Sequence, residues 1–70
     1  MITIEHPIQL EDNHLIPNIL FNLNLLSNVN CESYAHNSEN SSHVIKIQIN
    51  GKYTYQNILT IGMIIGEITK

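Results

Sequence analysis

Seventy residues with six acidic side chains, three lysines and no arginine exclude several classes of protein. A chain of this length forms one small domain, so we expect residues 1–70 to make a single β domain with a core of modest stability. Proteins that hold a nucleic-acid backbone place several cations on one face, which three lysines against a net charge of −3 do not supply, so we expect no nucleic-acid partner.

The first element is predicted over Ile2–Leu10, where apolar residues alternate with polar ones. Alternation with a period of two is typical of a half-buried strand. Pro7 interrupts the pattern, and proline is tolerated on an edge strand because an edge residue need not donate its N–H. We therefore expect an edge strand that ends at the turn-forming residues Glu11–Asn13.

The segment Ile19–Tyr34 decides the predicted fold class, because two periodicities compete there. A helical stripe would be formed by Ile16, Ile19, Leu20, Leu23 and Leu26. Alternation fits ten of the twelve positions from Phe21 to Glu32, and the five asparagines between Asn18 and Asn30 are poor helix formers. We interpret the segment as a strand and keep a helical turn before Ile19 as an alternative.

A hairpin is predicted around Asn50–Gly51. A two-residue turn at this dipeptide would pair apolar side chains with polar ones on each face of the hairpin. A three-residue loop instead pairs Ile47 with Tyr53 and Ile45 with Tyr55, and it puts the glycine at positive φ. We therefore predict the three-residue loop.

The same parity, carried back across the Asn/Ser-rich loop 36–42, predicts a three-stranded meander in which Ser33 faces His43 and Cys31 faces Ile45. The predicted inner face holds Phe21, Leu23, Leu25, Val29, Cys31, Ile45, Ile47, Tyr53 and Tyr55. We expect the two tyrosines to be cross-strand core partners rather than a platform for stacked bases.

The last segment, Ile58–Ile68, carries no charge before Glu67 and no proline. As a helix it would have one isoleucine stripe, with Gly62 and Gly66 spaced for close helix packing. Its β-branched residues and its two glycines favour a strand that is apolar on both faces. The fold is therefore predicted to be mainly β, with a small antiparallel meander of about four strands that is open or curled into a partial barrel.

Such a segment would be aggregation-prone if it were exposed. A sheet built from 70 residues covers one face of it and has little material left for the other. We therefore expect an interface, most simply in a symmetric homodimer or otherwise with another protein. The predicted interface residues are Ile58, Ile61, Met63, Ile64, Ile65 and Ile68.

Candidate chemistry centres on Cys31. Together with His36, His43 and Glu32 it offers zinc-ligand types, but their spacing matches no compact ligand motif. Nucleophilic catalysis would need the thiol beside a base and an oxyanion hole, whereas a mid-strand position predicts a buried, inert thiol. We expect no enzyme activity, no cofactor and no metal site.

The surroundings of the protein follow from the same features. The apolar stretch Ile58–Ile68 is too short to span a bilayer. The first residues lack the basic region and the following apolar run that are typical of a signal peptide. We therefore expect no membrane association. A single cysteine cannot form an intramolecular disulfide and suits a reducing compartment, so we expect a cytoplasmic protein.

Two segments resemble known families. Gln56–Ile68 resembles the opening strand of single-strand-binding OB domains, which implies a nucleic-acid-binding barrel as an alternative function. Ile19–Tyr34 with His43–Tyr55 resembles the long hairpin of SecB-type export chaperones. Neither resemblance brings an active-site residue. A short, acidic chain of this composition favours a small regulator or inhibitor, for example a phage-encoded one, with a structural subunit of a larger assembly as a further alternative.

Overall fold

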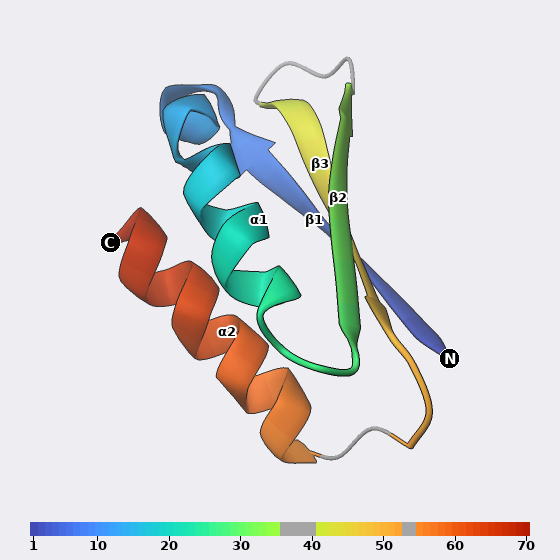
Figure 1. The fold of residues 1–70 in the computed structure, drawn as a ribbon. Coiled ribbons are helices and arrows are strands. Elements are labelled where there is room, and N and C mark those ends of the chain that lie inside the picture. Colours follow the sequence, from blue (N-terminus) through green and yellow to red (C-terminus); the bar gives the residue numbers. More distant parts are fainter. Residues whose placement is uncertain (36–40, 53–54) are drawn as a thin grey trace.

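The computed structural model describes residues 1–35, 41–52 and 55–70. Its elements are the strand β1 (Ile2–Gln9), the 3-10 helix η1 (Leu10–Leu15), the helix α1 (Ile16–Asn24), the strands β2 (Val29–Ala35) and β3 (Ser41–Ile49) and the helix α2 (Tyr55–Thr69). The strands form one antiparallel sheet in the order β1–β3–β2. Both helices lie on the same side of this sheet (Figure 1). The predicted small antiparallel sheet is confirmed among the described residues, but it is open, has three strands in a non-sequential order and carries two helices, so the fold is mixed α/β rather than a mainly β meander or partial barrel.

β3 is the central strand and supplies the middle of the core. Ile47 faces Ile4 of β1 on one side and Cys31 of β2 on the other. The side chains of Ile45, Ile47 and Ile49 are fully buried. Alternate residues of a strand point to the same face, so these three lie together under the helices.

The predicted hairpin partners of β3 are wrong. Ile45 pairs with His6 of β1 and with Ser33 of β2. Its predicted partner, Tyr55, is the first residue of α2. Tyr53, which was expected opposite Ile47, lies outside the described residues. Strands on both sides already pair with β3, so a hairpin partner after Gly51 has no edge to join.

β2 and β3 do pair as predicted, but two residues out of register. Cys31 faces Ile47 instead of Ile45, and Ser33 faces Ile45 instead of His43. A shift of two residues keeps every side chain on its own face, because the period of a strand is two. The prediction of which side chains of β2 and β3 point inward is therefore confirmed.

β1 lies at the edge of the sheet, as the position of Pro7 predicts. Its residues pair in order with β3 from Ile2 to Ile8, and the register shifts between Ile8 and Gln9. The side chain of Ile8 is buried, while Pro7 is exposed. The alternation in the sequence thus matches the two faces of this strand.

α1 occupies the first part of the segment that was predicted as a strand. Ile16, Ile19 and Leu23 are buried, at the three- and four-residue spacing of one helix face. Its asparagines lie off this face, and the Nδ2 of Asn22 donates to the carbonyl of the exposed Asn18 over 2.8 Å. Asparagine costs less than about 1 kcal/mol per helical position, so burial of the apolar stripe outweighs its poor propensity.

α2 is also a helix, so the strand interpretation of this segment is wrong. Among its side chains Ile61 is buried, and Ile64, Ile65 and Ile68 pack against the core from partly buried positions. The helical penalty of a β-branched residue is below about 1 kcal/mol, which burial of one apolar side chain exceeds. Because the segment is helical and the sheet is open, the likeness to an OB barrel fails, and α1 likewise interrupts the SecB-type hairpin.

Three residues that were expected in the core are exposed. Phe21 and Leu25 are each 66% exposed, and Tyr55 is 80% exposed. Phe21 lies on the outer side of α1 and Tyr55 begins α2, where a period of two does not hold. The observed core consists of Ile8, Ile16, Ile19, Leu23, Val29, Cys31, Ile45, Ile47, Ile49 and Ile61.

Asn24, the last residue of α1, protects the outer edge of β2. Its Nδ2 donates to the carbonyl of Cys31 over 2.9 Å, and its Oδ1 accepts from the backbone N–H of Cys31 over 2.7 Å. The side-chain amide thereby supplies the hydrogen bonds that a further strand would make. This contact also ties the end of α1 to the sheet.

We expect Asn24→Ala to lower the free energy of unfolding by about 1–3 kcal/mol, because it leaves two backbone groups of Cys31 without their partner. Asn30→Ala, at an exposed position of β2 next to Cys31, is the matched control and should change the free energy of unfolding by less than about 0.5 kcal/mol. Urea denaturation measures both, and equal effects of the two variants would contradict the role of Asn24.

Gly51 follows β3 with a φ of 72°, so its predicted positive φ is confirmed. An alanine there meets no atom within 4 Å but must adopt the left-handed conformation. We expect Gly51→Ala to destabilise the protein by about 1–2 kcal/mol. Gly62→Ala, equally open but helical, should stabilise it by up to about 1 kcal/mol. Thermal unfolding that moves both variants in the same direction would refute this difference.

Candidate functional site

α2 exposes an apolar stripe. Tyr55, Leu59 and Met63 recur every four residues and are 80%, 55% and 70% exposed. Residues at this spacing share one side of a helix. A surface helix usually carries charged and polar residues on its outer side, whereas α2 has no charged residue before Glu67. We call these three residues the outer stripe.

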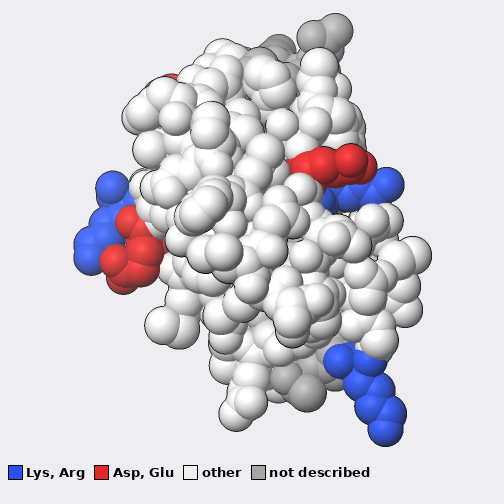
Figure 2. Space-filling view, in the orientation of Figure 1, with Lys and Arg blue, Asp and Glu red and all other residues white. Residues whose placement is uncertain are grey.

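The face of the molecule that carries the helices is largely uncharged. The acidic and basic side chains visible in this view lie at its margins, with a broad area of other residues between them (Figure 2). Phe21 and Leu25 add two further exposed apolar side chains, at four-residue spacing, from α1 and its C-cap. Several large apolar side chains left exposed on one small domain are typical of an interaction site.

Two grooves flank α2. The sheet groove, of about 410 Å³, lies between α2 and the inner face of β1 and β3 and is lined by Ile4, His6, Ile47, Ile58, Ile61, Gly62, Ile65, Gly66 and Thr69. The helix groove, of about 240 Å³, lies between α1 and α2 and is lined by Asn22, Met63, Ile64, Glu67 and Ile68. α2 thus contacts its own chain without filling the space on either side.

The six residues predicted as an interface divide among these places. Ile61 is 4% exposed and belongs to the core. The other five line the two grooves, the sheet groove with Ile58 and Ile65 and the helix groove with Met63, Ile64 and Ile68. Tyr55 was missed because it was expected in the core of the sheet. Leu59 was missed because a strand would put it on the same face as Ile61, whereas the helix turns Leu59 to solvent and Ile61 to the core.

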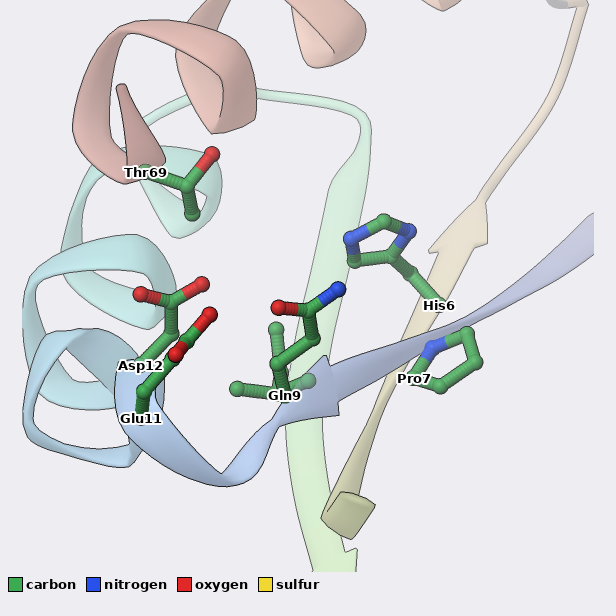
Figure 3. Close-up of a pocket in the computed structure, with 7 residues that line it drawn as sticks. His6, Pro7, Gln9, Glu11, Asp12 and Thr69 are labelled. Atoms are coloured by element: carbon green, nitrogen blue, oxygen red, sulfur yellow. The ribbon is translucent and has the colours of Figure 1, made fainter. Parts of the chain in front are cut away.

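A polar hollow of about 370 Å³ lies where β1 gives way to η1. Its lining is His6, Pro7, Ile8, Gln9, Glu11, Asp12 and Thr69. The labelled side chains surround an open space in which Glu11 and Asp12 lie next to each other (Figure 3). His6 and Thr69 line the sheet groove as well, so the hollow and that groove adjoin.

The opposite face of the sheet is polar. Lys46 faces Glu5 on one side and Glu32 on the other, an arrangement that favours the pairing of the three strands. The hydroxyl of Tyr34 donates to the carboxylate of Glu5, and this hydrogen bond raises the pKa of Tyr34. The apolar surface is therefore concentrated on the helical side.

Cys31 is a buried free thiol, as predicted. Burial, with a smaller contribution from Glu32, raises its pKa to about 11. His43 faces Ala35, four residues from Cys31 along β2, which corresponds to about 13 Å, so the two do not form a nucleophile–base pair. His36 lies outside the described residues. Within the ranges that the structure covers, no three His, Cys, Asp or Glu side chains are placed to hold a metal ion.

Neither helix of the described chain is long and apolar enough to cross a membrane. No protein-family model, curated protein or solved structure matches this chain. The apolar surface around α2 and the adjoining polar hollow are the candidate binding features of the described residues.

The raised pKa of Cys31 predicts a pH dependence of stability. Between pH 9 and 11 the thiol ionises in the unfolded chain but not in the folded one, since its ordinary value of 9.0 rises to about 11 on folding. Unfolding then releases a proton, so the free energy of unfolding falls as the pH rises through this window. Cys31→Ala should show a shallower fall in alkaline urea titrations. Parallel pH profiles for the two proteins would contradict the burial of the thiol.

Proposed function

We propose that this chain is a non-catalytic protein-binding module that acts through the apolar surface around α2, most simply as a symmetric homodimer. The observation that carries the proposal is the outer stripe of Tyr55, Leu59 and Met63, exposed on a helix without charge before Glu67. Water contact with such a surface is unfavourable by about 25 cal/mol for each Å² that a partner could cover. A second protein surface removes that cost.

The glycines of α2 support close approach of a partner. Gly62 and Gly66 are exposed, and a Cβ built on either one meets no atom within 4 Å. On a helical wheel both fall beside the outer stripe, so a second backbone could pack closely there. A symmetric homodimer needs nothing more than a patch that is complementary to itself.

The size and charge of the chain fit a small regulator or inhibitor that docks on a protein, and its reduced, buried thiol fits a cytoplasmic location. The nucleic-acid-binding alternative rested on a barrel, and an open sheet with a net charge of −3 offers it no support. A subunit of a larger assembly would use the same apolar surface and is distinguished by the size of the particle in solution.

Met63→Asp should dissociate the homodimer, because the carboxylate would be buried without a partner in the interface. We expect the dissociation constant to rise about 30-fold or more, as for loss of a residue that carries about 2 kcal/mol of binding energy. Light scattering over a range of protein concentrations measures the change. Asn30→Asp, which adds the same charge at an exposed position of β2 on the sheet face opposite the helices, is the control and should remain dimeric.

Far-UV circular dichroism must show that the Met63→Asp helices remain folded. A wild-type protein that stays monomeric up to millimolar concentration would contradict the proposed homodimer. A Met63→Asp protein with an unchanged dissociation constant would move the interface away from the outer stripe.

A further inference from the structure

The sheet groove and the polar hollow together form one cleft that changes character along its length. They meet at His6 and Thr69, which line both. β1 forms one wall from Ile4 to Gln9, and five steps of about 3.3 Å along a strand give the cleft a length of about 17 Å. Both parts are open to solvent rather than enclosed.

The apolar end is built to receive side chains. Ile4 lines it from the sheet above the buried Ile47, and Ile58 and Ile65 line its helical wall. Gly62 and Gly66 also line it and contribute no side chain, and the space beyond them is empty for at least 4 Å. Hydrocarbon placed here would leave water and contact isoleucine, which is favourable by about 0.8 kcal/mol for each methylene buried.

The polar end has a negative field. It carries the carboxylates of Glu11 and Asp12 beside each other, with Gln9 and His6 nearby (Figure 3). Thr69 of α2 also lines this hollow and carries no charge. The residues that line this hollow include no lysine, and Lys70 lies by Glu67 with its Nζ 3.7 Å from the carboxylate. A cationic group is the complement of this end.

We propose that the cleft binds a short extended segment of a partner protein, in which apolar side chains stand next to a lysine or arginine. The apolar side chains occupy the isoleucine-lined end, and the cation lies between Glu11 and Asp12. An open cleft about 17 Å long suits about five extended residues better than an enclosed small molecule. The inference rests on the proposed function in one respect, that the partner is a protein, and it does not require the homodimer.

Peptide titrations of the full chain, followed by the chemical shifts of its backbone amides, test the cleft. The first probe is a blocked five-residue peptide, leucine–valine–leucine–serine–lysine, and the second carries glutamate in place of its lysine. We expect the lysine peptide to bind at least tenfold more tightly, with the largest shifts at His6, Glu11, Asp12 and Thr69. Equal affinity for the two peptides would overturn the role of the acidic end.

Two variants locate the contacts. The double variant Glu11→Gln, Asp12→Asn should lower the affinity for the lysine peptide about tenfold. Glu32→Gln, on the opposite face of the sheet, should leave that affinity unchanged. Gly62→Leu fills the apolar end of the cleft and should lower the affinity for the lysine peptide. Because leucine has a higher helix propensity than glycine, this variant should remain folded. Unchanged affinity in both cleft variants would overturn the assignment.

The same titration in Met63→Asp separates this inference from the homodimer. Binding that persists in this variant supports the cleft independently of the dimer. No binding of the lysine peptide at millimolar concentration, either to a dimeric wild-type protein or to monomeric Met63→Asp, overturns the cleft and leaves the proposed function standing. Hexylamine that binds as tightly as the lysine peptide would overturn a polypeptide occupant in favour of a small amphiphilic cation.

Discussion

The burial of one face of β3 is the constraint on which the rest of this structure depends. Ile45, Ile47 and Ile49 are completely buried, while Lys46 on the other face is paired in register with Glu5 and Glu32 of the neighbouring strands. A sheet that is apolar on one side and polar on the other must have its covering on one side, and both helices are found there. α1 packs next to β2 and is tied to it by Asn24, whereas α2 packs against α1 and η1 and buries one residue, Ile61, fully. A chain of 70 residues thus covers its sheet with one closely packed helix and one that keeps apolar surface in contact with water.

The inward and outward faces of β2 and β3 could be predicted from the sequence, because the alternation of apolar and polar residues gives the same faces even when the pairing is wrong by two residues. Alternation assigns a side chain to a face, and the two-residue error in the pairing of Cys31 did not move it to the other face. Gly51 was equally predictable, since few other residues tolerate a positive φ. The helices were missed for a physical reason. In α1 the asparagines favoured a strand, yet the burial of Ile16, Ile19 and Leu23 decided the outcome, and propensity is a weak term beside such burial.

The candidate site was predictable in part. An uncharged, isoleucine-rich segment marks apolar surface in any fold, so Ile58–Ile68 was a reasonable place to expect an interface. Which of its side chains face solvent depends on how the helix packs, and the sequence pattern of an almost wholly apolar helix does not reveal it. The polar end of the cleft was not foreseeable, because Thr69 and Glu11 are brought together by the docking of α2 beside η1.

α2 keeps apolar surface exposed, and we propose that a partner covers it. Amide hydrogen exchange of the wild-type protein, measured at micromolar and at millimolar concentration, distinguishes a covered helix from a bare one. We expect the α2 amides to exchange several-fold more slowly at the higher concentration, while the amides of β3, protected within one chain, exchange at the same rate in both. Equal exchange of α2 at the two concentrations, with protection matching that of β3, would show that the chain covers this helix by itself and would rule out the proposed interface.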